Sequence, residues 1–285
     1  MVVNRDNAAS PRLRVSLNEG WRFCKGDAEG TGSCLEYARI KEWLLPTSAE
    51  FLPACAATPV RPGGTPCEKL PYADPAFDDS GWRVLDVPHD WGIEGPFDPC
   101  YPGETGRLPW WGVGWYRKHF SVQQDDLDQR LYLEIDGAMS FAMVWLNGNF
   151  VGGWPYGYTS FRLDLTPLIR WGQANLLAIR LDNPPESSRW YPGGGVYRNI
   201  WLLKTASVAV AQWGTFVTTP VVQPDRATVV VHVELDNRTD RVAPVDVVTE
   251  IYQLQKNGIP FPHKAAVSEV CRVNIPAHLH AFCSH

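Results

Sequence analysis

A chain of 285 residues with 45% apolar and 12% aromatic side chains can bury a sizeable core and form two domains. Its formal net charge of −5 gives no electrostatic reason to expect binding to nucleic acid or to an anionic membrane. No run approaches the roughly 18 apolar residues of a transmembrane helix, and residues 1–7 lack the apolar segment of a signal peptide. As written, the chain is expected in the cytoplasm, or in the periplasm or outside the cell if its true N-terminus lies upstream.

Seven cysteines cannot all pair within one chain, and they show no CxxC spacing. Three of them fall in a Pro/Gly-rich insert at about residues 26–72. These features favour free thiols in a reducing compartment and argue against a zinc site in the insert. Within the insert, Ile40, Trp43 and Leu44 have the i, i+3, i+4 spacing of a short helix between residues 35 and 51.

The rest of the first 206 residues shows short strands separated by turns. Alternating apolar side chains predict strands over residues 130–135, 175–181 and 196–205. Residues 141–151 predict a hairpin whose turn is Asn147-Gly148, because this pair is the strongest short-range hairpin signal. Many strands at intervals of about 8–12 residues favour a β-sandwich.

A second domain is expected after residue 206, where glycine and tryptophan become less frequent. Residues 228–235 and 245–252 predict two valine-rich alternating strands, typical of the start of an immunoglobulin-like sandwich. Such a sandwich needs about 100 residues, but fewer remain, and residues 276–285 do not resemble a finishing strand. We therefore expect this domain, 207–285, to be truncated or to carry a shifted reading frame near residue 275.

The most informative segment is residues 187–202, where Arg189, Trp190 and Tyr191 precede a Pro-Gly-Gly-Gly turn and a strand. Three glycines permit positive φ and close backbone approach, so the loop can hold these side chains at the rim of a sheet. Aromatic faces stack on the C–H groups of sugars and a guanidinium binds hydroxyls, which indicates a sugar-binding surface. The alternative is a tight hairpin with core aromatics.

Six ordered segments resemble the N-terminal sugar-binding domain of family 2 glycoside hydrolases, the family of β-galactosidases and β-glucuronidases. They are FDDSGW (77–82), VPHDW (87–91), GWYRK (114–118), VWLNG (144–148), SFRLDLT (160–166) and the loop at 187–202. The resemblance runs from about residue 17 to about residue 252 and is most like β-galactosidases. It implies an all-β chain, with a jelly-roll (galactose-binding-like) β-sandwich over residues 1–206 and an incomplete immunoglobulin-like β-sandwich over residues 207–285.

The resemblance places the catalytic groups outside this chain. In the family, two catalytic glutamates lie on a TIM barrel that follows both sandwiches, and a barrel needs roughly 250 residues. Retaining glycosidases need two carboxylates about 5–5.5 Å apart, whereas Glu94, Asp98 and Glu104 lie in a Pro/Gly-rich loop without a rigid scaffold. No residue here is therefore assigned a catalytic role, and the chain alone is expected to be inactive and to need no cofactor.

By resemblance, this domain forms one wall of the barrel's sugar pocket. Asp90 can accept from sugar hydroxyls while Trp91 packs on the sugar ring, and the alternative is a turn cap beside a core ring. Arg189, Trp190 and Tyr191 form the second candidate segment. In some β-galactosidases a carboxylate of this loop contacts galactose, but Arg189 occupies that neighbourhood here, so this role is not carried over.

Two further groups of residues have chemistry to consider. Arg107 and Trp110, in a loop with paired tryptophans, are candidates for lining the aglycone side, and plain packing is the alternative. Metal-ligand residue types occur at His278, His280, Cys283 and His285. Because these four lie at an untethered terminus without supporting partners, no metal is assigned.

The leading hypothesis is the non-catalytic N-terminal portion of a β-galactosidase-like enzyme that hydrolyses terminal β-galactosides with retention. Its partners would be a carbohydrate and the missing TIM barrel, not nucleic acid or a membrane. The alternatives are a stand-alone carbohydrate-binding module and a fragment that complements a separately encoded catalytic half.

Overall fold

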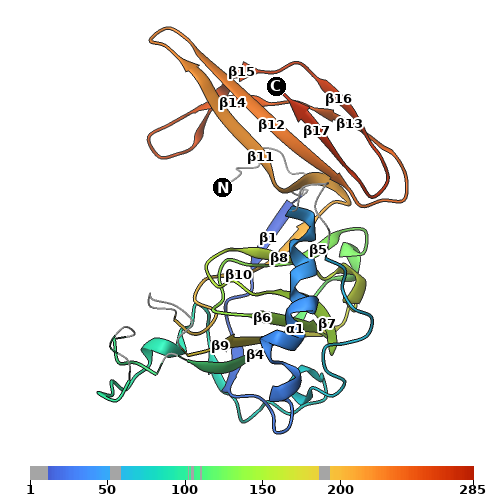
Figure 1. Ribbon diagram of the computed structural model, residues 1–285. Helices are drawn as coiled ribbons and strands as arrows, with labels where there is room; N and C mark the ends of the chain where they lie inside the picture. The colour runs from blue at the N-terminus through green and yellow to red at the C-terminus, as the bar shows by residue number, and fades with distance from the viewer. Residues whose placement is uncertain (1–11, 52–58, 102, 104–105, 110, 186–192) are drawn as a thin grey trace. The chain divides into compact units, whose positions relative to one another are not determined.

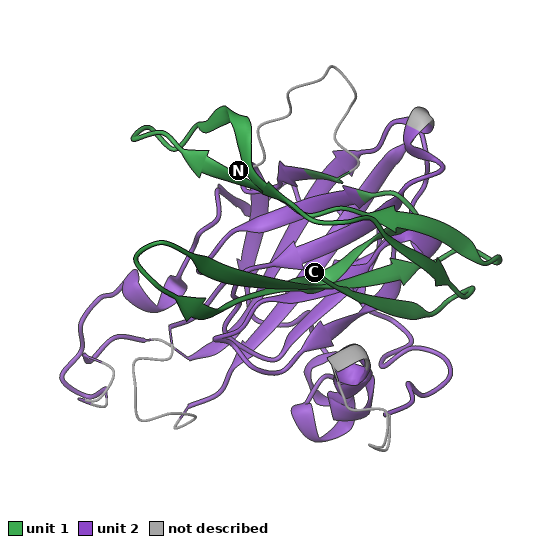
Figure 2. Cartoon of the chain, turned by 90° about the horizontal axis from the view of Figure 1, so that it is seen from above, with its two compact units in different colours: residues 1–13, 205–285 green, residues 14–204 purple. Residues whose placement is uncertain are grey.

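The computed structural model describes residues 12–51, 59–101, 103, 106–109, 111–185 and 193–285 (Figure 1). Strands dominate these residues and the helices are short, which confirms the all-β prediction. Two compact units can be distinguished, one of residues 14–204 and one that contains residues 205–285 (Figure 2).

The larger unit, residues 14–204, contains two sheets, and the first and last of their strands begin and end just outside these bounds. One has six strands in the order β3-β2-β4-β9-β6-β7, and the other has four in the order β1-β10-β5-β8. The strands are β1 Arg12–Ser16, β2 Trp21–Lys25, β3 Arg83–Leu85, β4 Gly112–Ser121, β5 Arg130–Ile135, β6 Ala142–Leu146, β7 Asn149–Trp154, β8 Phe161–Asp164, β9 Ala174–Asn183 and β10 Ile200–Thr205. The helices are α1 Tyr37–Leu44 and the 3₁₀ turns η1 Gly32–Cys34, η2 Leu45–Phe51, η3 Pro71–Ala73, η4 Trp91–Ile93, η6 Gln124–Asp126 and η7 Thr166–Leu168.

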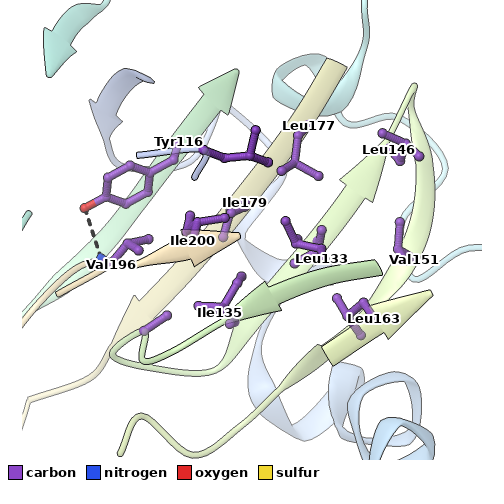
Figure 3. Close-up of a cluster of buried hydrophobic side chains, with 14 of the residues drawn as sticks. Tyr116, Leu133, Ile135, Leu146, Val151, Leu163, Leu177, Ile179, Val196 and Ile200 are labelled. Carbon is purple, nitrogen blue, oxygen red and sulfur yellow. Dashed lines mark hydrogen bonds between the residues drawn. The ribbon is translucent and has the colours of Figure 1, made fainter. Parts of the chain in front are cut away.

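The main core lies between these two sheets. Leu177 and Ile179 of β9 belong to one buried cluster with Leu133 of β5 and Ile200 of β10 (Figure 3). Each such side chain contributes about 1.5–3 kcal/mol when it is fully removed from water. The alternation expected for residues 130–135 and 175–181 is thus the alternation of a sandwich core.

The opposite face of the six-stranded sheet is also buried. Trp115 and Trp145 stack there with ring centroids 5.2 Å apart, and Ile40 and Leu44 of α1 pack in the same cluster. The short helix predicted between residues 35 and 51 is therefore confirmed, and its apolar positions cover the sheet. This cover explains why β9 is buried on both faces.

The insert also contains a disulfide between Cys34 and Cys67, whose Cα atoms are 5.8 Å apart. The expectation of free thiols is wrong for this pair, because a pairing across 33 residues depends on the fold and leaves no spacing signal. The free cysteines among the described residues are Cys24, Cys100, Cys271 and Cys283.

The predicted hairpin is confirmed as β6 and β7 with a turn at Asn147 and Gly148. Both turn residues have positive φ, 54° and 84°, as the favoured two-residue hairpin turn requires. The buried Asn147 amide also donates to the carbonyl of Leu168 and to Oδ1 of Asn175, while its Oδ1 accepts from the amide of Leu176. One side chain thus ties the turn to the start of β9.

The smaller unit has one three-stranded sheet, β11-β12-β17, and two pairs, β13-β16 and β14-β15. Its strands are β11 Val208–Val222, β12 Ala227–Asn237, β13 Ala243–Val247, β14 Glu250–Leu254, β15 Pro260–Val267, β16 Cys271–Ile275 and β17 His280–Ser284. Val231, Val233 and Leu235 of β12 form its core with Ile275 of β16.

Two expectations for this unit are wrong. Residues 245–252 form parts of two strands, because the chain leaves β13 before β14 begins. Residues 276–285 include a strand after all, since β17 pairs in register with β12, Cys283 opposite Val233 and Ala281 opposite Leu235.

Asn237 closes a loop of this unit. Its side-chain nitrogen donates to the carbonyls of Arg241, Ile275 and Pro276 at 2.8–3.1 Å. Its Oδ1 accepts from the amide and the hydroxyl of Thr239. The side chain is fully buried, so all of this bonding takes place away from water.

No helix in the described part of the chain is long and apolar enough to cross a membrane.

Candidate functional site

The loop after β9 has a fixed base. Gly195 and Met139 exchange two backbone hydrogen bonds, of 2.9 and 3.1 Å. The amide of His89 donates to the carbonyl of Val196, and the amide of Trp91 donates to the carbonyl of Gly194. These bonds join residues 89–91 to residues 194–196. The sequence did not predict that these two segments are in contact.

The Asp90 carboxylate strengthens this junction. Its Oδ1 accepts from the amides of Gly92 and Gly194, both at 2.8 Å. The first bond caps the 3₁₀ turn η4, and the second reaches across to the glycine loop. Because both donors are buried backbone amides, Asp90 satisfies groups that would otherwise lack a partner.

Trp91 lies in the core, with 1% of its surface exposed. Its ring stacks on Phe23 with centroids 5.8 Å apart, and a Cβ at Gly114 would lie 2.5 Å from its Cζ3. Asp90 thus caps a turn and Trp91 is a core ring, which is the alternative to sugar contact that the sequence left open for these two residues. Sugar contact by either residue stays a prediction.

Behind this junction lies a network that sequence reasoning missed. The ring of His89 contacts the hydroxyl of Tyr116 through Nδ1 at 2.7 Å and the carboxylate of Glu94 through Nε2 at 3.0 Å. Glu94 also pairs with Arg83 at 2.6 Å, and Tyr116 accepts from the amide of Val196 (Figure 3). Two of its residues lie in segments noted in the sequence, His89 in residues 87–91 and Tyr116 in residues 114–118, but no pattern linked them.

The two contacts of His89 fix the tautomer of its neutral ring. A carboxylate only accepts, so Nε2 carries the proton that is donated to Glu94 and Nδ1 accepts from the Tyr116 hydroxyl. Burial lowers the pKa of His89, although Glu94 opposes this effect. Burial also raises the pKa of Tyr116 well above its usual value. The network is therefore built on a neutral imidazole and a protonated phenol.

Two of the three carboxylates considered for catalysis, Glu94 and Asp98, are engaged in local structure, and the third, Glu104, lies outside the described residues. Burial would raise the pKa of Glu94, but hydrogen bonds from Arg83 and His89 outweigh it and hold the pKa below its usual value. Asp98 accepts from the amide of Cys100 at 2.8 Å. The roles seen for Glu94 and Asp98 are structural.

Arg107 is exposed and its guanidinium donates to the carbonyls of Pro99 and Tyr101 within its own loop. Tyr101 in turn packs against Trp111 in a T-shaped arrangement, with ring centroids 4.9 Å apart. The side chain that was a candidate for the aglycone side thus also holds its loop together. The remaining candidates, Trp110, Arg189, Trp190 and Tyr191, lie outside the described residues.

At Gly195 the junction has no room for any side chain. Its φ is 139°, and a Cβ there would lie 2.3 Å from the carbonyl oxygen of His89 and 2.7 Å from the Tyr116 hydroxyl. The triple glycine of the sequence indicated close backbone approach, and this position is where it occurs.

Comparison with known proteins finds relatives over most of the chain. The family model for the glycosyl hydrolase 2 galactose-binding-domain-like family matches residues 95–191. The β-galactosidase BoGH2A of Bacteroides ovatus is 46% identical over 253 residues, which cover 88% of this chain and 25% of that protein. A β-glucuronidase of Formosa agariphila is 26% identical over 234 residues, 70% of this chain and 24% of that protein.

Among solved structures, a glycosyl hydrolase family 2 member from Bacteroides cellulosilyticus matches with a TM-score of 0.71 and 29% identity, over 95% of this chain and 31% of that one. The chain spans about a quarter of the length of the two curated relatives. The resemblance seen in the sequence is confirmed: the chain belongs to the N-terminal region of family 2 glycoside hydrolases.

Proposed function

We propose that this chain forms one wall of the sugar pocket of a β-glycosidase and that the whole protein hydrolyses terminal β-galactosides. The observation that carries the proposal is the 46% identity to a β-galactosidase across most of the chain. The anchored junction of residues 89–91 with residues 194–196 supports it. A rigid base at residues 194–196 can present the loop before it, which carries Arg189, Trp190 and Tyr191, to a ligand with little loss of conformational entropy.

Within this wall we assign two kinds of role. Arg189, Trp190 and Tyr191 are proposed to contact the sugar, since stacking faces and a guanidinium suit its C–H groups and hydroxyls. Asp90 and Trp91 are proposed to position that loop, Asp90 through its bond to Gly194 and Trp91 through its buried ring. Arg107 and Trp110 are proposed for the aglycone side.

The test uses the whole protein with matched nitrophenyl β-galactoside and β-glucuronide substrates. We expect kcat/KM to be at least tenfold higher for the galactoside, whereas a preference for the glucuronide would overturn the assignment. The test is a real one, because a β-glucuronidase is also among the relatives. The chain of residues 1–285 alone should hydrolyse neither substrate, and turnover that survives purification would show a catalytic site within it.

We also propose that the protein works in an oxidising compartment. The Cys34–Cys67 disulfide supports this location over the cytoplasm, where such bonds are rare. Peptide mapping of protein taken from its natural source under acid quench tests the proposal. Recovery of the two cysteines as free thiols would contradict it.

A further inference from the structure

Three metal-ligand side chains meet in the smaller unit. The sulfur atoms of Cys271 in β16 and Cys283 in β17 and a ring nitrogen of His285 all lie within 4.8 Å of one another. Cys283 is buried, and the other two are half-buried. These residues come from both ends of a 15-residue stretch, so the cluster exists only because the strands bring them together.

The cluster differs from the one that the linear spacing suggested. His278 pairs with Asp240 at 2.8 Å and His280 pairs with Glu234 at 2.9 Å. In the fold, His278 and His280 therefore lie outside the cluster, and Cys271 belongs to it. The reason for assigning no metal was an untethered terminus, yet β17 is paired with β12 and the backbone of His285 exchanges two hydrogen bonds with Val231.

The ring of His285 is oriented by Ser268. The Ser268 hydroxyl donates its single proton to the carbonyl of Glu269 and accepts from the amide of Thr249. With that proton used, its oxygen accepts from Nδ1–H of His285, which it contacts, in the tautomer that protonates Nδ1. This bond leaves Nε2 of His285 with a lone pair, 2.9 Å from the sulfur of Cys283.

We propose that Cys271, Cys283 and His285 bind one Zn²⁺ ion. Two thiolates and a neutral imidazole are ligands that zinc prefers, and an imidazole held by a hydrogen bond at its other nitrogen is the usual supporting arrangement. Zn–S bonds of about 2.3 Å and Zn–N bonds of about 2.0–2.1 Å put tetrahedral ligand atoms roughly 3.5–3.8 Å apart. The three atoms lie within 4.8 Å of one another, so shifts of about 1 Å bring them to this spacing.

A fourth ligand has room at the site. A pocket of about 420 Å³ is lined by Cys271 and His285 together with Ser268, Glu269, Val270 and Ser284. A water molecule can enter there and complete the tetrahedron. The ion would join β16 of one sheet to β17 of another, and so act as a structural staple of this unit.

A disulfide between Cys271 and Cys283 is the competing outcome. It would use the same two sulfur atoms, but it would give no role to the oriented ring of His285. The convergence of that lone pair with both sulfur atoms is the observation that favours a metal ion over a disulfide.

The experiment uses the full chain without a histidine tag, kept reduced with a phosphine and freed of metal by a chelator. Titration with Co²⁺ should give one equivalent of a complex with a thiolate charge-transfer band and tetrahedral d–d bands, and one equivalent of Zn²⁺ should displace it. Cys271→Ser, Cys283→Ser and His285→Ala should each remove the one-to-one complex. Ser268→Ala should weaken binding about 10–100-fold while the ligands remain, because it frees the ring.

Matched controls are Cys34→Ser and Cys67→Ser, because the reductant releases that pair, together with Cys100→Ser and His280→Ala, and all four should bind Co²⁺ like the parent chain. Circular dichroism of each variant shows that it is folded, and Zn²⁺ should raise the melting temperature of the parent but not of folded His285→Ala. Absence of a stoichiometric complex, or a complex that survives both Cys271→Ser and Cys283→Ser, would overturn the proposal. So would a Cys271–Cys283 disulfide in protein purified with zinc and without reductant.

Discussion

Replacing Gly195 with alanine tests whether the junction of the two loop segments depends on close backbone approach. With φ at 139°, an alanine there adopts a strained conformation that costs about 1–3 kcal/mol. Its Cβ would also lie 2.3 Å from the His89 carbonyl oxygen, so the two segments must separate. Separation breaks both backbone bonds with Met139 and the bond from His89 to Val196, at about 1 kcal/mol each.

The expected total is therefore about 4–6 kcal/mol, a large part of the stability of an ordinary domain. Gly26→Ala is the matched control, because Gly26 also has a positive φ, 83°, but has no atom within 4 Å of its Cβ position. This control should lose only about 1–3 kcal/mol. The excess in Gly195→Ala measures the clash.

Urea unfolding followed by tryptophan fluorescence is a suitable assay, since every tryptophan except Trp213 belongs to residues 14–204. Fluorescence therefore reports mainly on the larger unit. Equal losses in Gly195→Ala and Gly26→Ala would refute the reasoning, because they would show that the segments separate at no cost or are not in contact.

Three further changes have expected outcomes. Asp90→Ala should lower the unfolding free energy by about 3 kcal/mol in the same assay, because two buried amides lose a charged acceptor, and Asp90→Asn should lose less than half as much; equal losses would contradict the role of the charge. His89 has a lowered pKa in the fold, so its contribution to stability is complete above about pH 6.5 and declines as the pH falls toward the folded pKa. His89→Gln should flatten this part of the stability–pH curve, and an unchanged slope would refute this role of His89. Reducing the Cys34–Cys67 bond should cost about 3–4 kcal/mol for its 33-residue separation, measured by urea unfolding with and without reductant, and coincident curves would argue against the bond.

Local patterns predicted the elements that local chemistry determines. Asn147-Gly148 specified its turn because both positions need positive φ, and the spacing of Ile40 and Leu44 specified α1. The alternation of β9 indicated a strand but not that both faces are covered. That burial depends on a distant insert, and nothing within the strand encodes it.

Long-range relations account for what the sequence did not predict. The partners of Cys34 and of β17 lie 33 or more residues away, so neither spacing nor composition identifies them. At the candidate site, Asp90 was chosen for its chemistry, but whether its carboxylate faces a ligand or the amide of Gly194 depends on where another loop lies. The His89–Tyr116 contact has the same origin, since the two residues are 27 positions apart.

The bonding of Asn237 bears on the choice of a host for producing this protein. Asn237-Arg238-Thr239 has the form of an N-glycosylation acceptor, but the nitrogen that would carry the glycan is buried and donates to three carbonyls. Oligosaccharyltransferase in a yeast or animal cell could reach it only before the strands close. A chain glycosylated before folding could not form the hydrogen bonds of Asn237. Such a host would therefore yield a mixture of unmodified protein and glycosylated protein that fails to fold. Bacteria without this enzyme avoid the loss.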